Sequence, residues 1–112
     1  MNLLSDDLQN IIKDFIIYKP IIKEELKTAV NLWCENKDEA LQKYGDISLW
    51  DTSLITDMSR LFFRKELFNS NISNWNVSNI ENMQSIFDGC KNFNQPLSNW
   101  NTSNVKFMNY MF

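Results

Sequence analysis

Histidine is absent from this 112-residue sequence, and glycine occurs only twice, at Gly45 and Gly89. Without histidine, the base that usually activates a serine or cysteine nucleophile is missing. Two isolated glycines also cannot form the Gly-rich loop that binds phosphate groups in many nucleotide-dependent enzymes. The sequence therefore predicts a protein without enzymatic activity and offers no catalytic residue.

Cysteine is scarce as well, and its placement argues against a metal site. Cys34 and Cys90 lie far apart and do not form the close pairs of a zinc site. Two interpretations stay open, a disulfide between them or two buried reduced thiols. We favour the reduced thiols, because a free cysteine commonly behaves as a small hydrophobic core residue. No metal and no cofactor are expected.

Long hydrophobic runs are also missing. No apolar stretch reaches the roughly 18 residues that cross a membrane. The N-terminus reads M-N-L-L-S-D-D-L, with no basic residue at its start and with Asp6 and Asp7 where a signal peptide is apolar. We therefore expect a protein without a membrane span that stays in the cytoplasm.

The charged residues are unevenly distributed along the chain, whose formal net charge is -3. Residues 1–46 hold nine acidic and six basic residues, whereas residues 47–112 hold five of each. The neutral second part is rich in Asn and Ser, which is a poor electrostatic match for a phosphate backbone. No nucleic-acid partner is expected. We interpret the acidic pairs Asp6–Asp7 and Glu24–Glu25 as solvated helix ends.

What the sequence does contain is a repeat with a period of about 25 residues. Residues 68–87 read F-N-S-N-I-S-N-W-N-V-S-N-I-E-N-M-Q-S-I-F, residues 93–112 return to this pattern, and residues 47–62 hold a less regular copy. Such self-similarity is the signature of a solenoid, in which each repeat buries its apolar residues against its neighbours. The predicted structural ladders are Trp50, Trp75 and Trp100; Met58, Met83 and Met108; and Phe62, Phe87 and Phe112.

Each repeat predicts two short elements. In the second copy, Ser78 and Glu81 are spaced as a capping box at the start of an apolar stripe, which indicates a short helix over residues 78–87. A turn followed by a very short strand over residues 75–77 is expected before it. Stacked strands of this kind would form a parallel sheet along one side of the solenoid. The predicted fold class is therefore α/β.

Three short helices are predicted before the repeats, where they would cap the first one. They cover residues 5–18, residues 23–34, and a segment that starts at Asn36, forms a capping box with Glu39 and stops at Gly45. The sequence ends inside the third copy, so the chain is either a fragment of a longer array, which we favour, or has its open rung covered by another chain. The predicted domains are a helical cap over residues 1–46 and a repeat solenoid over 47–112, with rungs at about 47–71, 72–96 and 97–112, the last incomplete.

The repeat pattern resembles a known family. Residues 44–112 carry the pattern W-[D/N]-x-S-x-[I/V]-x-x-M-x-x-[L/I/M]-F, followed by F-N-x-x-[I/L]-S-N-W. This pattern is similar to the surface-protein repeat of 25–26 residues found in mycoplasma and Listeria lipoproteins and in some large DNA viruses. That repeat is a relative of the BspA-like leucine-rich repeats. The resemblance implies a leucine-rich-repeat-like solenoid of about three rungs, each a short parallel strand plus a short helix, that serves protein interaction or adhesion without catalysis. This chain lacks the secretion signal and lipoprotein cysteine of the bacterial members, which favours an intracellular member, in the host cytoplasm if the source is a virus.

The leading functional hypothesis is a non-catalytic module that binds a protein partner. Variable positions of the repeat should face outward and select that partner, whose identity the sequence does not reveal. The incomplete third rung adds a second expectation, which is end-to-end association through its open face. The residues expected to form the binding surface are Arg60, Arg64, Lys65, Gln84 and Asn109.

Two alternative functions stay open. Glycan-binding adhesion would use the tryptophans as a stacking platform and the asparagines as a polar face. We favour core ladders for the tryptophans, and turn or inter-rung hydrogen bonds for the asparagines. A substrate adaptor is the other alternative, because residues 3–12, L-L-S-D-D-L-Q-N-I-I, faintly resemble the start of an F-box.

Overall fold

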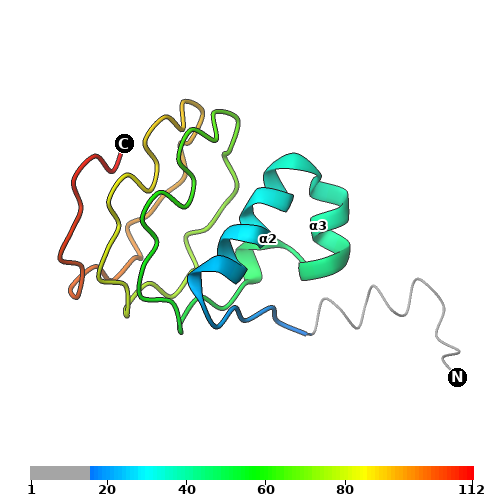
Figure 1. Ribbon diagram of the computed structural model, residues 1–112, viewed down its shortest axis with the longest axis horizontal. Helices are drawn as coiled ribbons and strands as arrows, with labels where there is room; N and C mark the ends of the chain where they lie inside the picture. Colours follow the sequence, from blue (N-terminus) through cyan, green and yellow to red (C-terminus); the bar gives the residue numbers. More distant parts are fainter. Residues whose placement is uncertain (1–15) are drawn as a thin grey trace, which may run out of the picture.

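The computed structural model describes residues 16–112 and shows two helices at one end of a stack of loops (Figure 1). The loops are the successive copies of the repeat, and the last of them, with the C-terminus, lies at the end far from the helices. We call each copy a rung: the first rung is residues 47–71, the second 72–96 and the third 97–112. The helix predicted over residues 5–18 falls almost entirely outside the described residues.

The helix α2 spans Lys23–Glu35, which confirms the helix predicted over residues 23–34. Its start has no Ser, Asp or Asn cap. The carboxylate of Glu25 instead accepts hydrogen bonds from the backbone N–H groups of Ile21 and Ile22, at 3.1 and 3.3 Å. These are donors at the helix start that the helix itself leaves unpaired. The side chains that α2 buries are Leu26, Ala29, Val30 and Trp33.

The helix α3 spans Lys37–Tyr44 and confirms the third predicted helix. The Asn36 side chain accepts a hydrogen bond from the backbone N–H of Glu39 at 3.2 Å, as the predicted capping box requires. Gly45 ends the helix with a φ of 75°, a left-handed conformation that glycine adopts without a steric clash. A single turn of 3-10 helix, η1 (Ile47–Leu49), then leads into the first rung.

The predicted fold class, an α/β solenoid with a strand and a helix in every repeat, is wrong. Over residues 16–112 the structure contains two α-helices and the short η1, and no strand or sheet. Parallel pairing in these residues is limited to two isolated bridges, which join Asp57 to Asn82 and Asn82 to Phe107. Residues 78–87, predicted as a helix, form successive turns instead.

Asparagine side chains explain why the predicted helix does not form. The carboxamide oxygen of Asn76 accepts hydrogen bonds from both the backbone N–H and the hydroxyl of Ser78, at 3.0 and 2.6 Å. Ser78 is therefore held in an Asx turn and does not cap a helix. The backbone N–H of Glu81 donates to the carbonyl of Thr56 in the first rung at 2.7 Å. The same Asx turn recurs at Asp51–Ser53 and Asn101–Ser103.

Backbone hydrogen bonds join each rung to the next at a fixed offset, one position short of the repeat period. The N–H groups of alternate residues in one rung donate to carbonyls of the following rung, and a few bonds run the other way, such as those from Glu81 to Thr56 and from Lys106 to Glu81. Each rung thereby satisfies the backbone of the rung before it. The pairs are Met58 to Asn82, Arg60 to Gln84, Phe62 to Ile86 and Arg64 to Asp88, then Met83 to Phe107, Ser85 to Asn109 and Phe87 to Met111, at 2.8–3.0 Å.

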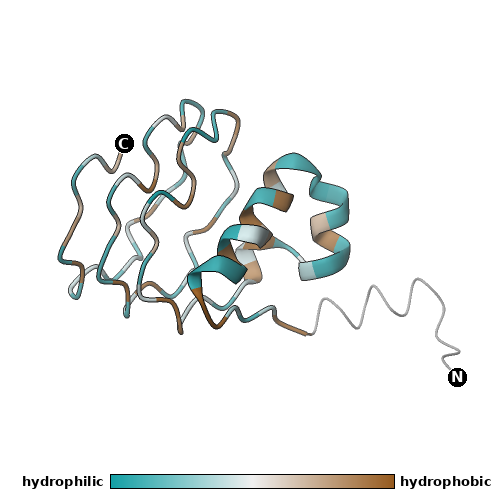
Figure 2. Cartoon of the chain, viewed as in Figure 1, coloured by the Kyte–Doolittle hydropathy of each residue, from teal (hydrophilic) through white to brown (hydrophobic). Residues whose placement is uncertain are grey.

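The core consists of like side chains that lie over one another in successive rungs. Trp50 stacks on Trp75 with ring centroids 6.2 Å apart, and Phe62 stacks on Phe87 at 5.5 Å. The indole N–H of Trp75 donates to the carbonyl of Ile47 at 2.7 Å, which satisfies a polar group inside the core. Hydrophobic residues recur at matching places along the rungs, with hydrophilic residues between them (Figure 2). Stacked aromatic side chains and the backbone hydrogen bonds between rungs, without regular strands, hold the repeats in register.

Candidate interaction surface

The five residues expected to form a binding surface fall into two groups. Arg60, Gln84 and Asn109 are exposed, and the backbone of Arg60 donates to the carbonyl of Gln84 in the next rung. Arg64 and Lys65 lie further along the first rung, on the wall of a groove beside α2. The structure therefore brings Arg64 and Lys65 to this groove and leaves the other three outside it.

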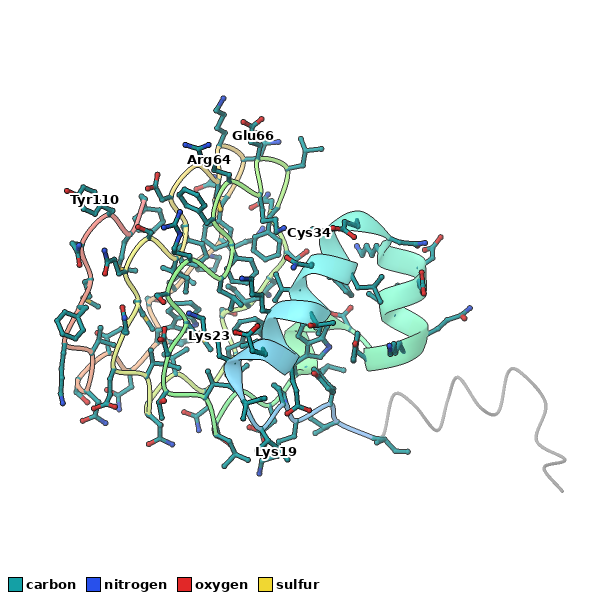
Figure 3. All side chains as sticks on the ribbon, in the orientation of Figure 1. Lys19, Lys23, Cys34, Arg64, Glu66 and Tyr110 are labelled. Carbon is teal, nitrogen blue, oxygen red and sulfur yellow. The ribbon has the colours of Figure 1, made fainter. Side chains whose placement is uncertain are left out.

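The groove lies between the C-terminal end of α2 and the tip of the first rung, and we call it the α2 groove. Its volume is about 700 Å³. Figure 3 shows Cys34 on the helix side of this region and Arg64 and Glu66 on the rung side. The residues that line it are Trp33, Cys34, Glu35, Lys37, Arg64, Lys65, Glu66, Leu67, Phe68, Asn69 and Ser70.

Aromatic side chains form the floor of the α2 groove. Trp33 is 5% exposed, and its indole N–H donates to the Ser70 hydroxyl at 2.9 Å, which ties α2 to the first rung. Phe68 is also nearly buried and stacks on Phe62 with ring centroids 4.2 Å apart. Leu67, by contrast, is 84% exposed. The fold itself fixes the floor, whereas the Leu67 side chain contributes little to the core.

Basic side chains outnumber acidic ones on the wall of the groove. Arg64 has a φ of 58°, a left-handed backbone conformation that is uncommon for a residue with a Cβ. Its guanidinium lies 5.1 Å from the centroid of the Phe63 ring, and that of Arg60 lies 4.1 Å from the same ring. Glu66 is partly neutralised by Lys91 of the second rung at 3.4 Å. The charged lining residues are Glu35, Lys37, Arg64, Lys65 and Glu66.

Both cysteines are free thiols in the structure, and Cys34 is exposed rather than buried as predicted. Cys90 is half-buried, and its thiol lies 2.8 Å from the carbonyl of Phe62, to which it donates. Burial raises the pKa of Cys90 to about 11, so this thiol is protonated at neutral pH. Partial burial against the groove wall also raises the pKa of Cys34, although Lys65 lowers it in part. Neither thiol has the lowered pKa of a reactive cysteine.

Residues that could ligate a metal do not gather in the described part of the chain. Across residues 16–112, no group of three or more His, Cys, Asp or Glu side chains is placed to hold a metal ion. The acidic residues of the first rung are instead paired with lysines. Lys23 contacts Asp57 at 3.2 Å, and Lys19 contacts Asp51 at 3.7 Å.

The ladder residues become more exposed toward the third rung. Phe112 still stacks on Phe87, with ring centroids 5.4 Å apart, but only one side of its ring is covered. The methionine and phenylalanine ladder residues of the third rung are therefore exposed, whereas those of the first two rungs are buried. The exposed fractions are 3, 3 and 8% for Trp50, Trp75 and Trp100; 0, 0 and 41% for Met58, Met83 and Met108; and 0, 1 and 74% for Phe62, Phe87 and Phe112.

Asparagine side chains form hydrogen bonds between the rungs. The side-chain amide of Asn79 donates to the carbonyl of Ser53 at 2.8 Å, and that of Asn104 donates to Ser78 at 2.6 Å. These amides are therefore engaged in holding successive rungs together. A recognition surface made of free asparagine side chains has no support at these positions.

Sequence reasoning missed the apolar part of the α2 groove. Leu67 stands where the second copy, one repeat period on, has Asn92. The packing of one rung on the next does not require a hydrophobic residue that only one copy of the repeat carries. The difference between the two copies at this position could therefore have drawn attention to Leu67. Trp33 carried no such signal, because it sits on the buried stripe of a helix like any core residue.

Comparison with known proteins relates the chain to one described group. A family model described as "Mycoplasma protein of unknown function, DUF285" matches residues 30–112. No curated protein and no solved structure matches the chain. The matched span includes both walls of the α2 groove and all three rungs. In the described part of the chain, every helix is too short or too polar to cross a membrane.

Proposed function

Because this chain belongs to the DUF285 family of Mycoplasma proteins of unknown function, a repeat family without an assigned activity, we propose that it is a non-catalytic module that binds another protein through the α2 groove. Family membership assigns no function, and both the binding of a protein and the α2 groove as its place are inferred from this chain's own residues. The absence of histidine from the sequence supports a role in binding over a role in catalysis.

The exposure of Leu67 is the observation that carries the proposal. Its side chain is 84% exposed, beside a floor made by Trp33 and Phe68 and next to cationic residues. The packing of successive rungs does not need a leucine here, because the second rung has Asn92 at the equivalent position of the repeat. Aromatic residues and arginine are enriched in protein interfaces, and an exposed apolar side chain beside them gives a partner an apolar surface to bury.

The charge of the groove indicates the partner's chemistry. Lys37, Arg64 and Lys65 face two acidic residues, and one of these, Glu66, is engaged by Lys91. A volume of about 700 Å³ accommodates a few side chains and not a whole domain. We therefore expect the partner to present a short segment with an apolar side chain over Leu67 and an acidic residue toward Arg64.

The alternative functions gain less support from the described residues. Glycan stacking needs exposed tryptophan faces, and the ladder tryptophans are 3–8% exposed. Adhesion would also require export, on which the structure is silent. The resemblance to an F-box rests on residues 3–12, which lie outside the described part of the chain.

Selection of peptides from a random library on the full chain tests this function directly. We expect an enriched motif that combines an acidic and an apolar residue. The double variant Arg64→Gly/Leu67→Asn should lose at least about tenfold in affinity for that motif, which is the loss expected of a hot spot. Each replacement is the residue found one repeat later in the second rung, which is Gly89 for Arg64 and Asn92 for Leu67.

Replacement of the exposed residues outside the groove provides the matched control. The variant Gln84→Ala/Asn109→Ala removes two polar side chains from the other part of the predicted surface and should bind the selected peptides as the wild type does. If no motif is enriched, or if the motif binds the groove variant unchanged, the α2 groove is not the binding site.

A further inference from the structure

The sequence has only two arginines, Arg60 and Arg64, and both lie on the same aromatic ring. Their guanidinium groups are 4.1 and 5.1 Å from the centroid of the Phe63 ring. Both arginines are exposed, and Phe63 is half-buried. Guanidinium groups stack on aromatic faces, so the ring holds two positive charges at one place on the surface. We call Arg60 and Arg64 on the Phe63 ring the arginine pair.

Acidic side chains of the described residues do not neutralise the arginine pair. The ion pairs among residues 16–112 all use lysine, and neither guanidinium belongs to one. Glu66, the next acidic residue along the chain, pairs with Lys91 at 3.4 Å. Asp88 of the second rung accepts the backbone N–H of Arg64 through its carbonyl, at 2.8 Å, and its carboxylate pairs with no cation of residues 16–112. The positive charges of the pair therefore face solvent.

The packing of the rungs does not require these side chains. Arg60 and Arg64 have left-handed backbones, with φ of 59 and 58°. Ser85 and Gly89, at the equivalent positions of the second rung, share this conformation, with φ of 57 and 80°. Glycine adopts it with least strain, whereas it is uncommon for a residue with a long side chain. The rung therefore needs the left-handed backbone at both positions and needs a guanidinium at neither.

Backbone hydrogen bonds fix the place of the arginine pair. The N–H of Arg60 donates to the carbonyl of Gln84 at 2.9 Å, and that of Arg64 donates to the second rung in the same way. The N–H of Phe63 donates to the carbonyl of Arg60 at 3.2 Å, which closes the turn between the two arginines. Because the stack sets the backbone, a ligand has to order only the side chains, which lowers the entropic cost of binding.

We propose that the arginine pair binds a phosphate group on a protein segment, such as a phosphorylated serine or threonine. The planar fork of a guanidinium matches the oxygens of a phosphate two at a time. A phosphate ester carries about two negative charges at neutral pH, which equals the charge of the pair, whereas a carboxylate carries one. Single carboxylates in the described chain are bound by lysine instead, as Asp57 is by Lys23.

A phosphorylated segment suits the arginine pair better than a membrane or a nucleic acid does. Anionic membranes are recognised by clusters of about four to eight basic residues, and nucleic acids by longer basic surfaces. The next basic residues along the rungs are Lys65 and Lys91, and Lys91 is engaged by Glu66. Residues 47–112 as a whole hold as many acidic as basic residues. Two or three cations are enough for one phosphate but not for a charged surface.

This inference goes beyond the α2 groove. Arg60 lies outside the groove, and phosphate binding at the pair needs no apolar ligand over Leu67. Leu67→Asn should therefore leave phosphate binding unchanged, whereas Arg60→Ser should weaken it. Failure of the groove as a binding site and failure of the arginine pair as a phosphate site are thus separate results.

Fluorescence polarisation with degenerate peptides on the full chain tests the proposal. One peptide library has phosphoserine at its centre and random flanking residues, and two matched libraries have glutamate or serine there. We expect the phosphoserine library to bind at least about tenfold more tightly than either of the others, as added charged hydrogen bonds predict. In NMR spectra, the Nε–H signals of the two arginines should both shift with the phosphoserine library.

Variants that copy the second rung locate the binding. Arg60→Ser and Arg64→Gly keep residues that adopt the left-handed backbone there, and each should lose at least about tenfold in affinity for the phosphoserine library. Arg60→Lys keeps the charge without the fork and should also bind less tightly. The matched control is Lys43→Ser, which removes a cation 5.4 Å from the Tyr44 ring and should bind as the wild type does.

Four results would overturn the proposal. Equal affinity for the phosphoserine and serine libraries would show that phosphate is not recognised, and equal affinity for phosphoserine and glutamate would make the ligand a carboxylate. Wild-type phosphoserine binding by Arg60→Ser would place the site elsewhere. Binding of phosphatidylcholine vesicles that contain a phosphatidylinositol phosphate, without binding of the phosphoserine library, would make the ligand a membrane.

Discussion

The two ends of the rung stack carry the same repeat but lie in different surroundings. One position of the repeat, compared across the three rungs, shows the difference. Asp57, Asn82 and Phe107 occupy equivalent positions in the three rungs and are joined by the two backbone bridges. Asp57 faces α2 and pairs with Lys23 at 3.2 Å. Asn82 lies between rungs, and its side chain accepts from the backbone of Gln84. Phe107 lies in the third rung and is 55% exposed.

This series separates what stacking requires from what the neighbour adds. Both Asp57 and Asn82 supply a side-chain oxygen that accepts the N–H of the residue two positions on, at 2.7 and 2.9 Å. The turn needs the oxygen and not the charge. The negative charge at Asp57 is matched to the lysine on α2. A difference between the residues at equivalent positions of two rungs therefore reflects the different segment that packs on each of them.

Aromatic side chains gather at the end of the stack that lies against α2. The ring of Tyr18 lies 4.5 Å from that of Tyr44 and 5.5 Å from that of Trp50, centroid to centroid. Burial, reinforced by the nearby Tyr44 and Glu25, raises the pKa of Tyr18 to about 12. The rings of Tyr18 and Tyr44 therefore cover Trp50 at this end of the stack. Substitutions should cost most where a side chain is covered on both sides.

Replacing Trp75 with alanine should give the largest effect. The ring lies between Trp50 and Phe62, at 6.2 and 5.8 Å, and its N–H is bonded to Ile47. We expect Trp75→Ala to cost about 3–5 kcal/mol in the free energy of unfolding, enough to unfold much of the stack. Trp100→Ala should cost less. Urea denaturation followed by circular dichroism measures both, and wild-type stability of Trp75→Ala would contradict the account.

Methionine-to-alanine replacements at one phase should show the contrast between covered and open rungs. Met83 is fully buried, and Met108 is 41% exposed. We expect Met83→Ala to cost about 2–5 kcal/mol, because it leaves a cavity between rungs. Met108→Ala should stay within about 0.5 kcal/mol of the wild type, as exposed positions do. Equal losses at the two positions in thermal melts would contradict this difference in burial.

Adding a side chain at Gly89 should lower the stability of the fold, although Arg64, at the equivalent position of the first rung, carries one. Gly89 has a φ of 80°, and an added Cβ would lie 3.0 Å from Arg64 Cγ and 3.1 Å from Arg64 Cα. We expect Gly89→Ala to cost about 1–3 kcal/mol through backbone strain and this contact. Arg64→Gly should be close to neutral, since glycine adopts the left-handed conformation freely. Chemical denaturation of the two variants side by side makes the comparison.

Asp57→Asn should give a small loss of stability with a pH dependence of known sign. Burial raises the pKa of Asp57, but hydrogen bonds from Ser59 and the contact with Lys23 outweigh it, so its pKa lies below the ordinary 3.8. A lowered pKa stabilises the fold above the ordinary value, and this stabilisation is lost as pH falls through the folded pKa. Because the pair is partly exposed, we expect the variant to lose about 0.2–1 kcal/mol at neutral pH.

The difference between wild type and Asp57→Asn should therefore be constant at neutral pH and disappear in acid. Asparagine keeps the turn oxygen, as Asn82 does in the second rung, so the fold itself is unchanged. Urea titrations between pH 2 and 7 would measure the difference. A gap that widens as the pH falls would reverse the assigned sign.

The helices α2 and α3 could be predicted because their signals are local. The apolar stripe of α2, and Asn36, Glu39 and Gly45 around α3, act within a few residues of one another. The repeat period likewise predicted that Trp50 lies over Trp75 and that Phe62, Phe87 and Phe112 lie over one another, because residues one repeat apart occupy equivalent places in successive rungs.

The local structure of the repeat could not be predicted in the same way. Ser78 and Glu81 have capping-box spacing, yet Asn76 binds the serine and the Glu81 N–H bonds Thr56 in the neighbouring rung. Apolar residues at offsets of three and four fit a chain of turns as well as a helix. The choice depended on partners a full repeat away, which local spacing does not contain. The α2 groove was missed for the same reason, since its two walls come from different segments.

The register of the rungs is tested most directly by nuclear Overhauser contacts between the aromatic rings of Phe62 and Phe87 and of Phe68 and Phe93. Their centroids are 5.5 and 5.7 Å apart. The stacked-rung account predicts cross-peaks for both pairs, together with contacts between amides of residues 58–64 and residues 82–88. Missing ring contacts, combined with the sequential amide pattern of a helix over residues 78–87, would contradict it.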